Sequence, residues 1–180
     1  GASAYDVAVS GNYAYVVSAT TGLTDELEIF DISDPTNPTK VGGVDAADSA
    51  NGVTVVGNYA YVVSASTGDD LEIFDVSDPT NPTKVGGAEA ADSANDVTVV
   101  GNYAYVASDS TGDDLEVFDI SSSTNPVKVG GVEGNSNSES LAIAGNYAYT
   151  GNSDRFEIFD ISGLITPTAE IGNLLSNDIE

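Results

Sequence analysis

The sequence contains no cysteine, histidine, methionine or tryptophan among its 180 residues. Without cysteine and histidine there are no disulfides, common zinc sites, haem attachment sites, or Cys–His and Ser–His–Asp catalytic groups. Basic residues are also scarce: four Lys and Arg stand against 29 Asp and Glu, giving a formal net charge of −25. Such acidity repels phosphates, so nucleic acid is not expected as a partner, whereas cations and basic proteins are favoured.

Long hydrophobic runs are missing as well. No stretch approaches the roughly 20 apolar residues of a membrane helix, so membrane insertion is not expected. The start, Gly1-Ala2-Ser3-Ala4, lacks the basic residues and apolar stretch of a secretion signal. Since the chain begins without Met, a mature product, a trimmed chain and an excerpt of a longer protein are all compatible with it. The missing signal therefore does not argue against secretion.

What the sequence does contain is a repeat of about 44 residues. The pentapeptide Gly-Asn-Tyr-Ala-Tyr recurs at intervals of 46, 44 and 44 residues, beginning at Gly11, Gly57, Gly101 and Gly145. A Phe-Asp pair recurs 27 residues before each following pentapeptide, at Phe30, Phe74 and Phe118, and again at Phe159. The distance from pentapeptide to Phe varies, which places the length variation in one surface loop of each repeat.

Each repeat holds four strand-like apolar runs separated by turn residues, as the second repeat shows with 53–56, 59–63, 71–74 and 84–88. Gly57-Asn58 is typical of a tight hairpin, and 78–82 is a Pro-containing turn. Four antiparallel strands per unit predict an all-β fold, a four-bladed β-propeller with blades of about 44 residues. We expect a single domain over 1–180, with blades at approximately 1–48, 49–92, 93–136 and 137–180.

Two ring geometries are compatible with four repeats. A ring closed within one chain is favoured, because a compact domain closes on itself when it can. In the competing geometry, two chains or a longer parent protein supply eight blades to a wider ring.

The repeats also resemble a known family. A Val-rich strand, Gly-Asn-Tyr-Ala-Tyr-Val, and a hydrophobic strand ending in Asp-Ile/Val-Ser-Asp-Pro-x-x-Pro are similar to the LVIVD repeat, with 29–35 and its copy 73–79 most specific. The resemblance implies a propeller blade and a habitat in bacterial or archaeal surface or secreted proteins. It implies no catalytic residue. The third repeat departs at Ser122-Ser123 and the fourth at Gly163-Leu164, where the Asp-Pro of the turn is lost.

Acidic residues gather in the loops predicted to share one rim of the ring. Carboxylates with nearby Asn and Ser oxygens suit hard cations, calcium above all, which accepts six to eight oxygen ligands. The candidate ligands on the rim are Asp69, Asp70, Asp113 and Asp114. The competing interpretation is a solvated acidic surface, adapted to high salt or kept soluble by charge.

A second candidate lies where the innermost strand of each blade begins, at Asp6, Gly52, Asp96 and Ser140. In a four-bladed ring the first and third blades are opposite, so Asp6 and Asp96 would face each other across the channel. Together with backbone carbonyls they could hold one axial cation. Alternatively, each Asp caps its own loop. No cofactor is required by the sequence, and calcium is the one ion it favours.

Two residue types recur in every repeat and are therefore expected to serve the blade. The Asp after each Phe is predicted to accept turn N–H groups: Asp31, Asp75, Asp119 and Asp160. The two Tyr of each pentapeptide lie on one strand face and are predicted to pack between blades rather than to stack on sugars.

The leading functional prediction is a noncatalytic extracellular or cell-surface module that binds a protein or glycan partner or builds an assembly, with self-association compatible. A carboxylate-based hydrolase acting on glycans is the enzymatic alternative, and it needs one acid with a raised pKa in an apolar pocket. An engineered or excised repeat protein without its own activity is the third.

Overall fold

The computed structural model describes residues 3–19, 25–65, 68–90, 93–109, 112–134 and 137–164. These residues form 15 β-strands in four antiparallel sheets, so the all-β prediction is confirmed. No helix occurs among them, and hence none that could cross a membrane.

Each sheet is built from consecutive strands, paired in chain order. The first sheet contains β1 (Ser3–Ser10), β2 (Tyr13–Ala19), β3 (Leu27–Asp31) and β4 (Thr39–Val44). The second contains β5 (Ala50–Val56), β6 (Tyr59–Ser64), β7 (Leu71–Asp75) and β8 (Thr83–Ala88). The third contains β9 (Ala94–Val100), β10 (Tyr103–Ser108), β11 (Leu115–Asp119) and β12 (Val127–Val132). The fourth contains β13 (Ser140–Ala144), β14 (Tyr147–Gly151) and β15 (Phe156–Asp160). The fourth strand predicted for the last blade lies outside the described residues.

The first hairpin of each sheet turns on the glycine of the pentapeptide. Gly11, Gly57, Gly101 and Gly145 all have φ between 59° and 61°, a left-handed conformation that side-chain-bearing residues rarely adopt. Directly after this glycine and its Asn, the Tyr pairs with the residue before the glycine, as Tyr13 does with Ser10. The glycine therefore fixes the register of the first two strands, and the register decides which side chains face the neighbouring sheet.

The Asp that follows each Phe makes the turn contact predicted for it. The carboxylate of Asp31 accepts the N–H of Ser33 at 2.8 Å, and the same contact recurs in the other three repeats at 2.9 Å. This hydrogen bond lowers the pKa of the Asp31 carboxyl, because it favours the charged form. These four Asp residues thus close the turn after the third strand.

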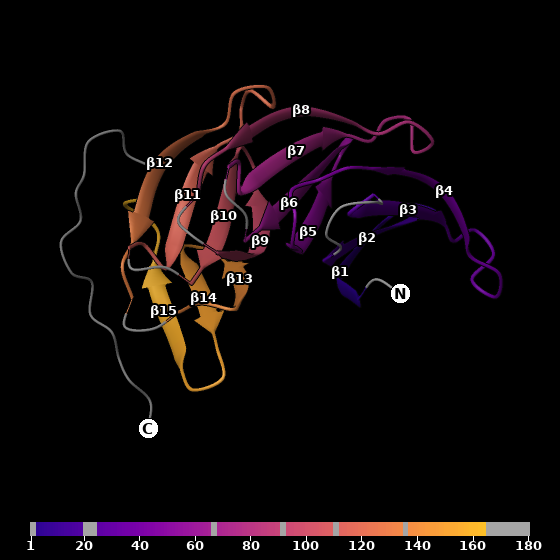
Figure 1. Cartoon of the computed structure of the whole chain (residues 1–180). Coiled ribbons are helices and arrows are strands. Elements are labelled where there is room, and N and C mark those ends of the chain that lie inside the picture. The colour runs from indigo at the N-terminus through magenta and orange to yellow at the C-terminus, as the bar shows by residue number, and fades with distance from the viewer. Residues whose placement is uncertain are drawn as a thin grey trace.

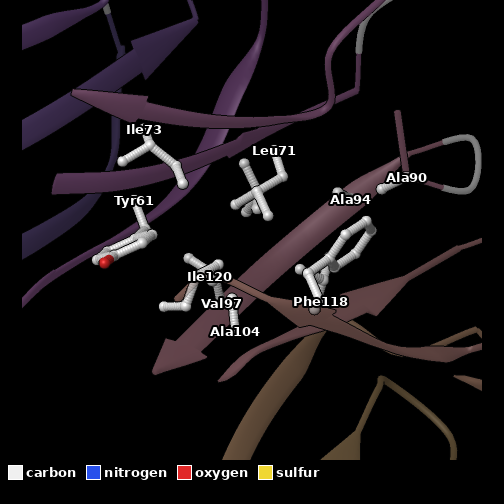
Figure 2. Close-up of a cluster of buried hydrophobic side chains, with 11 residues drawn as sticks. Tyr61, Leu71, Ile73, Ala90, Ala94, Val97, Ala104, Phe118 and Ile120 are labelled. Atoms are coloured by element: carbon white, nitrogen blue, oxygen red, sulfur yellow. The ribbon is translucent and has the colours of Figure 1, made fainter. Parts of the chain in front are cut away.

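Neighbouring sheets pack through two different apolar faces. We call the face that looks toward the next sheet the leading face, formed in the first sheet by Tyr15, Val17, Leu27 and Ile29. It packs on the receiving face of the second sheet, formed by Ala50, Val53, Ala60, Val62, Phe74 and Val76. The second junction repeats this arrangement, and Figure 2 shows Tyr61, Leu71 and Ile73 of the second sheet opposite Val97, Ala104, Phe118 and Ile120 of the third. The third junction is built alike. The predicted packing of the tyrosines between sheets is confirmed for Tyr15, Tyr61 and Tyr105, which are all buried.

The four sheets follow one another along an open arc, with β1, β5, β9 and β13 on its inner side and β4, β8 and β12 on its outer side (Figure 1). The receiving face of the first sheet and the leading face of the fourth sheet are both exposed, notably at Val7 and Ile158. The expected closure of a ring within one chain is therefore not seen in the described residues. Four propeller-like blades are present, and their two ends are open.

Candidate functional site

On the inner side of the arc, Asp6 and Asp96 each join two neighbouring sheets. Asp6 accepts the N–H of Val7 in its own strand and the N–H of Val53 in β5, both at 2.8 Å. Asp96 accepts the N–H of Val97 and the N–H of Leu141 in β13, both at 2.7 Å. These carboxylates thus connect the first sheet to the second and the third sheet to the fourth.

Both carboxylates lie beside β5. The equivalent position in the second sheet is Gly52, in β5. A Cβ added there would lie 2.9 Å from the carbonyl oxygen of Asn95 and 3.1 Å from Cα of Asp96, so β5 and β9 approach closely at this glycine. Burial raises the pKa of the Asp96 carboxyl against the effect of its two N–H donors, and the charge of Asp6 raises it further. The two groups therefore interact electrostatically. The axial cation between them stays a prediction.

Two asparagines add further links along the same inner strands. The side-chain amide of Asn51 donates to the carbonyl oxygen of Ala94 at 2.9 Å, and that of Asn95 donates to the carbonyl oxygen of Ser138 at 3.0 Å. Polar contacts between inner strands thus accompany the apolar packing behind them.

On the rim, two of the four predicted calcium ligands bind lysines. Lys84 donates to Asp69 at 3.0 Å, and Lys128 pairs with Asp113 at 2.9 Å. The first repeat has the same pair between Lys40 and Asp25, at 3.0 Å. These acids are used in ion pairs that recur from blade to blade.

The same lysines bind a second acid that the sequence reasoning did not single out. Lys40 binds Glu28, Lys84 binds Glu72 and Lys128 binds Glu116. The exposed fraction of the glutamate side chain falls from 30% to 7% to 1% along the series. The sequence did contain a signal for this role: the third strand of each sheet carries a glutamate at the same position, between apolar residues that are expected to be buried. Glu72 also accepts the N–H of Ala47 at 2.6 Å, which ties the second sheet to the loop leaving the first.

The other two rim candidates, Asp70 and Asp114, are buried. Asp114 accepts the N–H of Gly134 at 2.6 Å. A Cβ added to Gly134 would lie 2.6 Å from an oxygen of Asp114 and 2.6 Å from an oxygen of Glu157, so glycine lets both carboxylates approach the same point. Burial raises the pKa of Asp114 to about 6, and the charge of Glu157 contributes in the same direction.

The arrangement can therefore do two things chemically: hold sheets together through charged hydrogen bonds, and raise the pKa of one carboxyl group, that of Asp114, to about 6. Within the described ranges, no group of three or more Asp and Glu is placed to hold a metal ion. The four rim residues and the Asp6/Asp96 pair are thus located. Of the rim residues, Asp69 is exposed, Asp113 is half-buried, and Asp70 and Asp114 are buried.

The pattern of the LVIVD repeat matches the chain four times, at residues 1–46, 47–88, 91–133 and 136–172. The chain belongs to the LVIVD-repeat family. The resemblance seen in the sequence is thereby confirmed, and each matched LVIVD unit supplies one sheet of the arc. Curated proteins give no match.

Solved structures with the same fold as this LVIVD protein include both natural and designed chains. The computationally designed Ika4 protein has a TM-score of 0.66 at 13% identity, covering 89% of this chain and 92% of that one. A functionally unknown protein from Desulfotomaculum acetoxidans has a TM-score of 0.70 at 16% identity, covering 88% of this chain and 51% of that one. The computationally designed Ika8 protein has a TM-score of 0.58 at 12% identity, covering 89% and 59%. The LVIVD chain thus spans about half the length of the Desulfotomaculum acetoxidans protein and about three fifths of the length of Ika8.

Proposed function

We propose that this chain is a noncatalytic binding or scaffold module made of propeller blades, which works outside the cell or at its surface. The observation that carries the proposal is the repeated structural use of its carboxylates. Glu72 accepts a backbone N–H across a sheet junction, Asp6 and Asp96 do the same, and Asp69 and Asp113 bind equivalent lysines. Acids that do the same task in more than one blade build the scaffold, and a unique active site is not needed to explain them.

The binding surface we propose is the acidic hollow at the junction of the second and third sheets. It is lined by Glu89, Asp113, Glu116 and Glu133, with Lys128 as the one basic group among its lining residues. A partner that presents basic side chains would find complementary charge there, and a divalent cation could join an acidic protein or glycan to the same surface. This makes a basic protein segment the preferred ligand and calcium an accessory ion.

One observation favours the glycan hydrolase as a second candidate. Asp114 has a carboxyl group with a raised pKa next to a second carboxylate, Glu157, which is the combination that an acid catalyst and its partner require. Both side chains are buried, and Gly134 stands between them, with its N–H on Asp114. A sugar ring has no room between these groups in this arrangement. The pair therefore supports the binding module better than the enzyme.

The test uses a labelled deca-lysine peptide as the probe and fluorescence anisotropy as the readout. A Glu89→Gln/Glu133→Gln variant should weaken binding several-fold more than a control with the same loss of charge, Asp34→Asn/Asp78→Asn, on exposed turns of the outer side. Equal weakening by both variants would show nonspecific attraction and refute a binding site in the hollow.

The catalytic alternative is tested separately, by the release of reducing ends from a panel of soluble polysaccharides. We expect no turnover. Turnover that disappears in Asp114→Asn and in Glu157→Gln, while both variants keep their β-sheet circular dichroism, would replace the binding module by the hydrolase.

A further inference from the structure

The two open ends of the arc are the two halves of one interface that the chain already uses three times. On the receiving side, Val7 of the first sheet is 56% exposed, whereas the equivalent Val53, Val97 and Leu141 are 5%, 3% and 9% exposed. In the other three blades the preceding sheet covers this side chain, and the difference in exposed fraction shows how much of it that sheet buries. Tyr5 and Val9 of the same strand are exposed to a similar degree.

The leading face of the fourth sheet is likewise more exposed than its equivalents. Phe156 is 52% exposed and Ile158 is 44% exposed. Their equivalents in the other three sheets are completely buried by the sheet that follows: Leu27, Leu71 and Leu115 for the first position, and Ile29, Ile73 and Val117 for the second. Phe156 is already ordered against Tyr149, with ring centroids 6.2 Å apart. Among the described residues, the fourth sheet thus presents a leading face that no other sheet covers.

We propose that a second copy of this chain covers both faces, so that two chains form one ring with two identical head-to-tail junctions. The leading face of each copy would pack on the receiving face of the other, through the same residue positions as the three internal junctions. The inference concerns the partner of the apolar end faces and holds whether or not the acidic hollow binds a ligand.

The repetition of the internal junctions argues for a second copy over closure within one chain. Equivalent residue positions meet at each of the three junctions, and after four sheets the ends of the arc have not met (Figure 1). Closing the gap inside one chain would require different packing at three junctions. A second copy leaves all of them unchanged and adds two more of the same kind.

Two-fold symmetry also strengthens the association. Head-to-tail contacts give a closed ring when the rotation closes and an open filament when it does not. Once the first junction of a closed dimer forms, the second becomes an intramolecular event with a high effective concentration. This compensates for the repulsion between two chains of net charge −25, which salt also screens.

The first measurement is the solution mass of the wild-type chain, by sedimentation equilibrium in 0.5 M NaCl. We expect twice the chain mass of 18.3 kDa. Val7→Asp and Ile158→Asp should each raise the dimer dissociation constant at least about a hundredfold, because each homodimer would bury a charge at both junctions. The control is Val127→Asp, at an exposed valine of the outer strand β12, and it should leave the mass at two chains.

A mixture of the two variants distinguishes this geometry from other dimers. The Val7→Asp chain keeps an intact leading face, and the Ile158→Asp chain keeps an intact receiving face, so the mixture can form one unaltered junction. Its mass should move back toward two chains. Circular dichroism confirms that each variant is folded, and the milder Val7→Ser and Ile158→Ser pair repeats the test if the Asp variants unfold.

Four results would overturn the proposal. A monomeric wild type at 100 µM would show that no second copy covers the ends. Filaments or higher closed rings would show that four further sheets do not complete the turn. A dimer sensitive to only one of the two variants would indicate a face-to-face contact. A mixture that stays monomeric while each variant is folded would contradict the head-to-tail junction.

Discussion

Replacing Asp114 by Asn should stabilise the protein at neutral pH. Burial raises the pKa of this carboxyl from 3.8 to about 6, against the N–H of Gly134, and nearby carboxylates add to the effect. The folded state therefore binds the proton more tightly than the unfolded chain. The stability gained from the protonated form is complete below about pH 3.8 and is lost as the pH rises through about 6.

The size of the effect follows from the same values. The pKa of Asp114 is about two units higher in the folded protein than its ordinary value, which corresponds to about 3 kcal/mol at 1.36 kcal/mol per unit. Water near the rim reduces this free energy, so we expect a stabilisation of about 1 to 3 kcal/mol. Asparagine keeps an oxygen for the N–H of Gly134 and removes the charge. Asp114→Asn should thus be more stable than wild type at pH 8 and about equal to it at pH 4.

Urea unfolding at several pH values between 4 and 8 measures this difference, with salt and protein concentration held constant. The neighbouring Asp113→Asn is the matched control, because its carboxylate pairs with Lys128 on the surface and its loss should not stabilise the protein at pH 8. If Asp114→Asn is less stable than wild type at pH 8, the ionised carboxylate is favourable where it lies, and the reasoning is wrong.

Three further predictions concern the ion pairs within the sheets, one close contact between blades, and the inner carboxylates. Lys128→Met leaves a buried glutamate without its lysine and should lower the free energy of unfolding by about 2 kcal/mol, whereas Lys40→Met, whose partners are more exposed, should cost under about 1 kcal/mol in the same urea titration. Gly130→Ala places a Cβ 2.6 Å from a backbone oxygen of the next blade, so its melting temperature should fall, by an amount equivalent to about 1 to 3 kcal/mol. Calcium should raise the melting temperature more than sodium at equal ionic strength, and Asp6→Asn/Asp96→Asn should remove that increment. The variant should also melt at a lower temperature in both salts, because asparagine has one acceptor oxygen for the two N–H groups that each carboxylate accepts. Equal melting curves in the two salts would refute the axial site.

The local structure could be predicted from the sequence because it depends on residues close together in the chain. The hairpin glycines, the Asp that caps the turn after each Phe, and the tyrosine faces all follow from short-range rules of backbone conformation and strand alternation. They are confirmed at equivalent positions, with φ near 60° at Gly11 and an N–H of Ser33 on Asp31. Repetition made each of these predictions four times over.

The roles of the carboxylates could not be predicted in the same way. Asp6 was singled out as a partner of Asp96 for a cation, and the sequence did not indicate that its second oxygen accepts the N–H of Val53 from the adjacent sheet. Likewise Asp69 and Asp70 are neighbours in the sequence, but one is on the surface with Lys84 and the other is buried. Such differences depend on how one sheet packs on the next. The residues that meet there are some 44 positions apart in the chain, so no local pattern predicts the contact.

The sequence favoured a ring closed within one chain and left a wider ring of eight blades as the alternative, because it does not fix the angle between successive sheets. The receiving face of the first repeat and the leading face of the fourth carry the same kinds of apolar residue as their buried equivalents, so the pattern of the repeat fits a closed ring of either size. Only the exposure of Val7 and Ile158 in the folded chain distinguishes an open arc from a closed one.

The absence of cysteine makes a direct test of the central claim possible, that the two ends of the arc join between copies. In a Val7→Cys/Ile158→Cys chain, a short thiol-specific cross-linker should give a two-chain product in which mass spectrometry finds the residue 7 peptide linked to the residue 158 peptide of the other copy. Mixing with isotope-labelled protein identifies links between chains. A Val7→Cys/Val127→Cys control should give none. A link formed within single chains, or no link at concentrations where the protein is dimeric, would contradict the account.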